Sequence, residues 1–306
     1  MNSDIFAAID IGSNAVRLLV GHALFEKDAY EMKQIAYLRV PIRLGEDVFI
    51  TGRVGEDKFA KLLDAFHAFQ HLVRAFGASQ IRACATSAMR DAENGEQLVE
   101  QIMKSAGISI EIISGQEEAD LVYAASSAKE IPPEDGSSLY VDVGGGSTEV
   151  ILYEENRMII HESFQIGTVR MLYPEASQEA MDKEKKRLAS CLGDAHRLYS
   201  PKALVASGGN INKIHKILGK KKREIIVPAE LQKLHAKLNP LNTVERMLAL
   251  DLNYYRADVI VPALEIFMNI CGHCPSVRAI YVPKAGLADG LIHDMCKKRL
   301  LAEKSK

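Results

Sequence analysis

The pattern of apolar and polar positions predicts two successive α/β segments. In the first, apolar residues that alternate or run continuously, with many β-branched side chains, indicate strands at 5–11, 15–25, 31–39, 81–85 and 108–113. Helices are expected at 92–106 and 117–128, and a longer one where apolar residues recur at three- and four-residue steps from Phe59 to Phe76. Gly77 ends this stripe, whose phenylalanines we expect in the core.

The second segment repeats this order. Its expected strands are 139–143, 148–153, 157–164, 203–206 and 277–282. Its expected helices lie near 168–173, 178–198, 211–218, several within 228–271, and 287–301. Residues 131–138 are rich in turn-forming residues and predict the domain crossing. We therefore expect domains at 1–128 and 129–306, with the closing helix 287–301 packing back on the first domain.

One strand pair contains an acid and three glycines in an otherwise apolar run. Asp142 lies in the first strand, and Gly144 to Gly146 form the turn that follows it. Because glycine has no Cβ, the backbone N–H groups of such a turn can approach an anion closely. A shift of 132 positions superposes Asp10 on Asp142 and Gly12 on Gly144, which indicates an internal duplication. The expected fold class is α/β, with two similar mixed-sheet domains that face each other across an interdomain cleft.

Composition narrows the function classes. With a net charge of -2, the 306-residue chain has no global attraction for nucleic acid or anionic membranes. No apolar run approaches the roughly 20 residues that span a bilayer, and the amino terminus lacks the basic start of a signal peptide. We therefore expect a cytoplasmic protein without nucleic-acid or membrane partners.

The five cysteines form no disulfide framework, because their number is odd and their positions are scattered. Cys271 and Cys274 form a C-x-x-C pair, but the pattern places the pair at the end of a helix, where no helix N-terminus lowers a thiol pKa. A role for these two thiols in redox or metal chemistry is therefore not favoured.

The two turns predict a site that binds phosphate groups. Backbone donors would come from two sets of positions, Asp10, Gly12, Ser13 and Asn14 in the first turn, and Gly144, Gly145, Gly146 and Ser147 in the second. Asp142 and Glu149 flank the second turn, one on each strand, so their carboxylates can converge on Mg²⁺, which typically takes one or two protein carboxylates. Glu149 could equally be a solvated strand residue.

Two further segments join a strand to a helix and contain charged residues that could act in catalysis. Glu117 and Glu118 begin a helix, where acids complement the helix dipole, but a carboxylate that points into a cleft could serve as a general base. Arg90 could neutralise phosphate, or it could pair with Asp91 or Glu93.

A third strand-to-helix turn, residues 206–210, contains Gly208 and Gly209 and has phosphate- or nucleotide-binding character, although it could be only a close packing turn. Basic runs near 183–187, 220–223 and 297–299 are typical of solvated faces, but they could also attract a long polyanion.

Five segments, in this order, resemble the exopolyphosphatase and guanosine pentaphosphate phosphohydrolase family of the actin-like ATPase superfamily, whose domains have a duplicated ribonuclease H-like fold. They are Ala8-Ile-Asp-Ile-Gly-Ser-Asn14, Ala85-Thr-Ser-Ala-Met-Arg-Asp-Ala-Glu-Asn-Gly95, Ile113-Ser-Gly-Gln-Glu-Glu-Ala119, Val141-Asp-Val-Gly-Gly-Gly-Ser-Thr-Glu149 and Arg256-Ala-Asp-Val-Ile-Val-Pro262. The length is similar to that of the short, two-domain form of this family.

The resemblance implies an exopolyphosphatase that releases orthophosphate from inorganic polyphosphate with Mg²⁺ or Mn²⁺. Glu118 matches the family's catalytic base, Asp142 and Glu149 match its metal- and phosphate-site acids, and Arg90 matches a cleft arginine. Alternatives are 5′-phosphohydrolysis of guanosine pentaphosphate, a nucleotide-dependent kinase or ATPase, and a non-catalytic sensor. The expected partners are the phosphate substrate and, as a possible assembly, a second copy in a homodimer.

Overall fold

The structure is a computed structural model that describes residues 2–27, 29–126, 137–155, 157–174 and 178–304. The chain divides into two compact units, one formed by Met1–Ala125 with Gly286–Lys306 and the other by Ser126–Ala285. Of the predicted domain crossing, residues 131–136 lie outside the described part, and the last two residues already belong to a strand. Among the described residues, no helix combines the length and apolar character needed to cross a bilayer.

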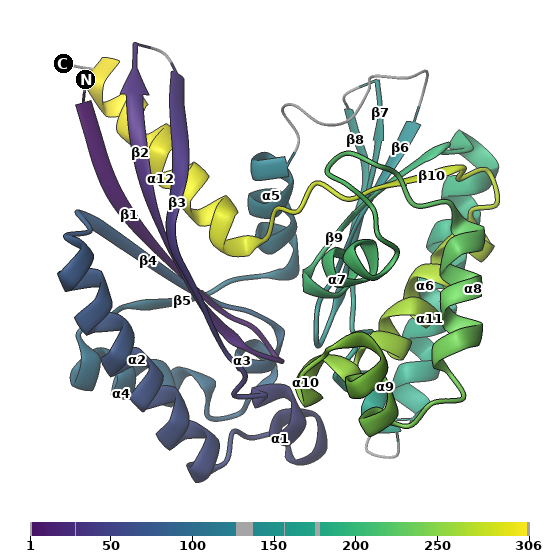
Figure 1. The fold of residues 1–306 in the computed structure, drawn as a ribbon, viewed down its shortest axis with the longest axis horizontal. Coiled ribbons are helices and arrows are strands. Elements are labelled where there is room, and N and C mark those ends of the chain that lie inside the picture. Colours follow the sequence, from purple (N-terminus) through teal and green to yellow (C-terminus); the bar gives the residue numbers. More distant parts are fainter. Residues whose placement is uncertain (1, 28, 127–136, 156, 175–177, 305–306) are drawn as a thin grey trace. The chain divides into compact units, whose positions relative to one another are not determined.

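The first unit has a mixed sheet flanked by helices (Figure 1). Its strands, within the described part of the chain, are β1 (Asn2–Ile11), β2 (Val16–Glu26), β3 (Ala29–Val40), β4 (Gln80–Ala85) and β5 (Ile110–Ile112), in the spatial order β3-β2-β1-β4-β5. Its helices are α1 (Leu44–Thr51), α2 (Glu56–Phe76), α3 (Ser87–Asp91), α4 (Gly95–Ala106), α5 (Gly115–Ser126) and α12 (Leu287–Lys304). Helix α12, which follows the whole second unit in the sequence, packs against β1 and β2.

The second unit repeats the same sheet. Its described strands are β6 (Ser137–Val143), β7 (Thr148–Glu154), β8 (Arg157–Phe164), β9 (Ala203–Ser207) and β10 (Ala279–Tyr281), in the order β10-β9-β6-β7-β8. Its helices are the 3₁₀ turn η1 (Arg170–Leu172), α6 (Gln178–Tyr199), α7 (Gly209–Ile217), α8 (Pro228–Leu238), α9 (Thr243–Leu250), α10 (Tyr254–Ala257) and α11 (Ile260–His273). In both units the first two pairings are antiparallel and the next is parallel. The predicted α/β fold with two duplicated mixed sheets is therefore confirmed.

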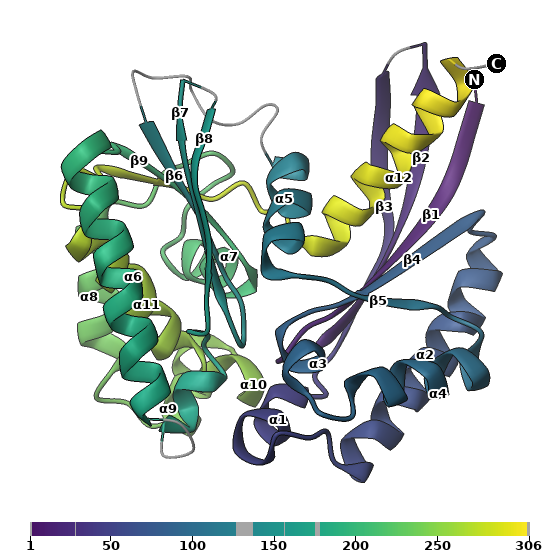
Figure 2. The same cartoon turned by 180° about the vertical axis from the view of Figure 1, so that it is seen from behind.

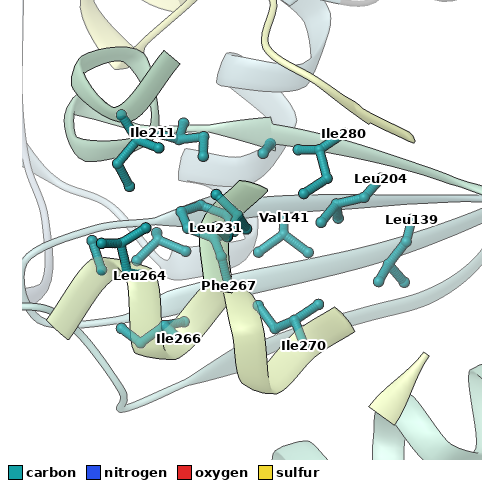
Figure 3. Packing of buried hydrophobic residues seen from close by; sticks show 14 of the residues in the cluster. Leu139, Val141, Leu204, Ile211, Leu231, Leu264, Ile266, Phe267, Ile270 and Ile280 are labelled. Carbon is teal, nitrogen blue, oxygen red and sulfur yellow. The ribbon is translucent and has the colours of Figure 1, made fainter. Parts of the chain in front are cut away.

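Apolar faces that the sequence pattern predicts do form the cores. On α2, Leu62, Phe66 and Phe69 are buried, and Gly77 ends the helix with a φ of 69°. In the second unit, Phe267 and Leu264 of α11 belong to the same buried cluster as Val141 of β6 (Figure 3). These continuous cores hold the strand ends, and the turns that follow them, in defined positions.

Three predictions about local structure were wrong. Helices α1 and α3 lie in segments where no helix was predicted, and residues 168–173 form the short η1 rather than a full helix. In the last case the N–H groups of Leu172 and Tyr173 donate three residues back, to the carbonyls of Val169 and Arg170, which is the bonding of a 3₁₀ turn and not of an α-helix.

Candidate active site

The first glycine turn connects β1 to β2 and directs its peptide N–H groups to one side. The N–H of Gly12 donates to the carbonyl of Ala15 at 3.1 Å. The carbonyls of Ser13 and Asn14 accept from the N–H groups of Gly45 and Arg43, at 2.9 and 3.2 Å. In a planar trans peptide the next N–H points opposite to the carbonyl, so those of Asn14 and Ala15 point away from α1. The Ser13 hydroxyl is buried and has no hydrogen-bond partner among the described residues, which suits a turn that receives a ligand.

The second glycine turn, between β6 and β7, repeats this geometry. The N–H of Gly144 donates to the carbonyl of Ser147 at 2.9 Å, the same bond at the positions shifted by 132 residues. The carbonyls of Gly144 and Gly145 accept from Thr168 and Val169, at 3.1 and 2.8 Å. The N–H groups of Gly145 and Gly146 therefore point to the opposite side, as a cradle for anionic oxygens requires.

The close approach of the following loop to this turn explains why position 167 is glycine. A Cβ atom on Gly167 would lie 2.4 Å from the backbone nitrogen of Gly146, and no side chain fits there. Arg170 donates from Nε to the carbonyl of Gly146 at 2.8 Å. The segment from Gly167 to Arg170 thus fixes the orientation of the glycine turn from behind.

The residue opposite the strand acid differs between the two units. Asp10 lies opposite Arg17, and Arg17 Nη1 donates to Asp10 Oδ2 at 2.5 Å. Asp142 lies opposite Glu149, and both are buried, with exposed fractions of 7% and 1%. The sequence analysis missed Arg17, although the 132-residue shift aligns it with Glu149 and could have revealed it. The charge of Asp10 is thus balanced by Arg17, within its own unit, and does not require a metal ion.

The paired acids of the second unit suit a hard divalent cation. Ser163 Oγ donates to Glu149 Oε1 at 3.2 Å and orients that carboxylate. Burial, and secondarily the charge of Asp142, raises the pKa of the neighbouring Tyr140 hydroxyl well above its usual value. Two buried carboxylates leave the remaining coordination positions of Mg²⁺ for water and phosphate oxygens. No group of three or more His, Cys, Asp or Glu side chains that could hold a metal ion occurs in the described part of the chain.

Gly208 brings the third turn next to this acid pair. Its φ is 105°, and a Cβ there would lie 2.6 Å from the carbonyl oxygen of Val143 and 3.1 Å from Oδ1 of Asp142. Asn210 Nδ2 donates to Thr168 Oγ1 at 3.1 Å, and so connects α7 to the segment behind the glycine turn. In the second unit, Asp142 therefore lies next to the turn at 206–210 and the start of α7, and α7 is bonded to the segment behind the glycine turn at 144–147.

A cavity of about 340 Å³ adjoins Gly209 in the second unit. Lys213, Lys216 and Arg256 line it, with Asn253 among the polar residues. Burial, followed by the charges of Lys216 and Arg256, lowers the pKa of Lys213. Asp251 also lines the cavity and opposes this shift, but three cations against one acid leave the lining with a positive net charge, which suits an anionic ligand.

Glu117 and Glu118 have different surroundings at the start of α5. The N–H of Glu117 is capped by Ser114 Oγ at 3.1 Å, and its carboxylate lies 3.5 Å from Arg82 Nη2. Glu118 is half-buried. The helix-start interpretation thus fits Glu117, and Glu118 remains the candidate general base.

Arg90, on α3, makes no ion pair with Glu93, which pairs with Arg53 at 3.2 Å. Its Nη1 donates instead to the carbonyl of Ile113 at 2.7 Å. This bond ties α3 to the segment that leads into α5.

The C-x-x-C pair lies at the end of α11, as predicted. Cys274 is buried, and its Sγ donates to the carbonyl of Leu192 at 3.3 Å. Burial raises the pKa of Cys271 to about 11 and that of Cys274 to about 12. Thiols of such high pKa are almost fully protonated at neutral pH, and a protonated thiol is a poor nucleophile.

Comparisons with known proteins identify the family and agree with the fold. Residues 23–299 match the model of the Ppx/GppA phosphatase family. The Aquifex aeolicus member of that family is 23% identical and superposes with a TM-score of 0.75, over 97% of this chain and 99% of its own. An exopolyphosphatase from Cytophaga hutchinsonii is 22% identical, with a TM-score of 0.80 over 95% of this chain and 97% of its own. An exopolyphosphatase-like protein is 24% identical, with a TM-score of 0.79 over 98% of this chain and 100% of its own. At these identities the structural likeness shows a shared fold.

Proposed function

We propose that this chain, which belongs to the Ppx/GppA phosphatase family, is an exopolyphosphatase that releases orthophosphate from the end of inorganic polyphosphate. Its family makes it a phosphohydrolase. The observation that carries the finer proposal is the repeated glycine turn, in which bonded carbonyls direct the N–H groups of Gly145 and Gly146 to one side. A turn of this geometry suits a substrate that carries phosphate groups.

The proposed chemistry is in-line attack by water on the terminal phosphorus. Glu118 orients the water and accepts its proton, the water oxygen bonds to the terminal phosphorus, and the bond from that phosphorus to the bridging oxygen breaks. The shortened chain leaves with the bridging oxygen, and the terminal phosphorus is released as orthophosphate. Arg90 and the turn N–H groups stabilise the negative charge that spreads over the phosphoryl oxygens. Ser13, with its buried hydroxyl, donates to a phosphate oxygen.

Asp142 and Glu149 would hold Mg²⁺, or alternatively Mn²⁺. When bound, the cation would neutralise charge on the phosphate oxygens. Gly208 keeps the space beside Asp142 free of a side chain, because a Cβ there would lie 3.1 Å from Oδ1.

Phosphate release from polyphosphate of defined length tests the proposal. With the purified protein and Mg²⁺, we expect orthophosphate as the sole short product. The Glu118→Gln variant, purified in the same way, is the control for contaminating phosphatases. Release of chain fragments would contradict an exopolyphosphatase and favour an enzyme that cuts polyphosphate internally. Activity that requires ADP would favour a kinase.

The cavity next to Gly209 favours a second candidate, 5′-phosphohydrolysis of guanosine pentaphosphate. Its volume of about 340 Å³ lies within the range of small-ligand pockets. Its lysines would contact the phosphates or ribose of a nucleotide. Lys213→Ala should then raise KM for guanosine pentaphosphate about tenfold and leave KM for polyphosphate unchanged. Lys237→Ala, an exposed substitution on α8, is the matched control. An equal effect on both substrates would argue against a nucleotide-specific pocket.

A further inference from the structure

Helix α12 contacts helix α5 through a glycine, in the first unit (Figures 1 and 2). A Cβ atom on Gly290 would lie 2.5 Å from the carbonyl oxygen of Leu121 and 2.7 Å from its carbonyl carbon. The obstruction is backbone, so no side-chain rotation could relieve it. Any larger residue at this position would move α12 and α5 apart.

Arg82 provides a second connection between the same two helices. From β4 its guanidinium reaches Asp294 on α12 at 2.8 Å and Glu117 on α5 at 3.5 Å. It also donates to Glu111 on β5 at 2.7 Å. Only 15% of its side chain is exposed, so these charges act with less screening than on an open surface.

Both connections fix one face of α5. Glu117 and Leu121 are four residues apart and therefore lie on the same side of the helix. Glu118 follows Glu117 by one residue, which turns its side chain by about 100° around the helix axis. Any rotation or shift of α5 on these contacts would therefore move the Glu118 carboxylate.

We propose that Gly290 and Arg82 are positioning residues for Glu118, acting through the backbone and register of α5. This inference rests on the proposed function, in which Glu118 is the general base. A helix displacement of about 1 Å is enough to lower the rate of such a reaction about a hundredfold, because the base must stay within hydrogen-bond reach of the attacking water. Gly290 and Arg82 need not contact the substrate for this effect.

Gly290→Ala tests the proposal, with Gly193→Ala as the matched control. Gly193 lies within α6, and nothing lies within 4 Å of the Cβ it would gain, so the same substitution is tolerated there. We expect Gly290→Ala to lower kcat about tenfold to a hundredfold with KM within about twofold of the wild-type value. Gly193→Ala should leave both constants unchanged.

A double-variant comparison separates positioning from general damage. In the Glu118→Gln background, measured under single-turnover conditions, Gly290→Ala should cause no further loss, because the group that it displaces is already inactive. A Gly290→Ala protein that folds and keeps the wild-type kcat would overturn the proposal. So would an equal loss in both backgrounds, because the damage would then not act through Glu118.

If Gly290→Ala fails to fold, a second pair of variants decides the question. Glu117→Gln weakens the Arg82 contact with α5, and Glu111→Gln weakens the contact with β5; the two carboxylates are 48% and 49% exposed. We expect kcat to fall about twofold to fivefold in Glu117→Gln alone. Equal rates in the two variants would contradict positioning through α5.

The same variants test the role of Glu118 as general base separately from the positioning role of Gly290 and Arg82. Turnover retained by Glu118→Gln would overturn the role of Glu118 in the proposed function. An inactive Glu118→Gln together with an unaffected Gly290→Ala would overturn only the positioning proposal.

Discussion

Arg17 donates from Nη1 to Oδ2 of Asp10 at 2.5 Å across the β1–β2 pair, whereas the equivalent pair in the second unit is Asp142 opposite Glu149. The duplicated turns have therefore diverged in charge. An acid paired with a base is already neutralised, while two facing carboxylates repel one another until a cation joins them. This divergence is the reason that we propose the second unit as the metal-binding one.

Removal of Arg17 should destabilise the protein through Asp10. Arg17→Met leaves the buried Asp10 carboxylate without its cation, and we expect the free energy of unfolding to fall by roughly 2–3 kcal/mol. The loss should be below that of a fully buried pair, because 21% of the Arg17 side chain is exposed. Urea unfolding measures the change. The double variant Asp10→Asn, Arg17→Met is the control and should recover part of the loss; a double variant as unstable as the sum of both single changes would contradict this account.

Substitution of either acid in the second unit should weaken Mg²⁺ binding. We expect Asp142→Asn and Glu149→Gln each to lower Mg²⁺ affinity by at least about tenfold, the loss that even an outer-shell partner can cause. Calorimetric titration of Mg²⁺ into the protein, in the presence of a non-hydrolysable polyphosphate analogue, measures the Mg²⁺ affinity independently of turnover. Asp10→Asn serves as the control and should keep the wild-type affinity. Equal losses in all three variants would remove the reason for proposing a metal in the second unit.

Glu118→Gln should lower kcat by about 10²–10⁴ and leave polyphosphate binding unchanged, because an amide cannot accept the proton of water. Phosphate release gives kcat, and a filter-binding assay gives affinity. Glu117→Gln differs by one position and should lose no more than about fivefold. Turnover retained by Glu118→Gln would exclude this carboxylate as the base.

The C-x-x-C thiols should react slowly in the native protein. Burial raises the pKa of Cys271 to about 11 and of Cys274 to about 12, so few thiolates exist at pH 8. Iodoacetamide should label both residues quickly only after unfolding, as mass spectrometry can follow. Cys271→Ser should keep wild-type phosphate release. Fast labelling of the native protein at pH 8 would show that burial does not protect these thiols.

Asp289, near the start of α12, should make stability depend on pH. Burial is the main cause of its raised pKa, the nearby Asp10 adds to it, and the bond from the Gly286 N–H opposes it. Because the folded pKa exceeds the usual value of 3.8, the neutral form stabilises the fold fully below that pH, and this contribution is lost as pH rises through the raised pKa.

Asp289→Asn keeps an oxygen for the Gly286 N–H, which donates to Oδ2 at 3.0 Å in the wild type, and it removes the titration. Thermal unfolding from pH 4 to 8 should show the wild type losing stability relative to this variant as pH rises. A difference in Tm that is constant over the whole range would argue against a titrating Asp289.

The elements predicted correctly from the sequence are those with long, regular apolar patterns. The strand β1 and the helix α2 each bury one face over many residues, and the resulting spacing of apolar residues is visible in the sequence. The missed helix α1 is short, begins after Arg43 in a left-handed conformation, and is anchored by the bond from the Gly45 N–H to the Ser13 carbonyl. Such a helix depends on tertiary contacts more than on its own propensity.

The sequence by itself determined the duplication, the two glycine turns and the acids beside them, because each of these follows from neighbouring residues in one strand pair. Only the tertiary structure decided how those groups are aimed. Bonds from Thr168 and Val169 turn the N–H groups of the glycine turn to one side, and Gly290 sets α12 against α5 although Leu121 is far away in sequence. Contacts between distant segments depend on the packing of whole sheets and helices, and no local pattern of residues encodes them.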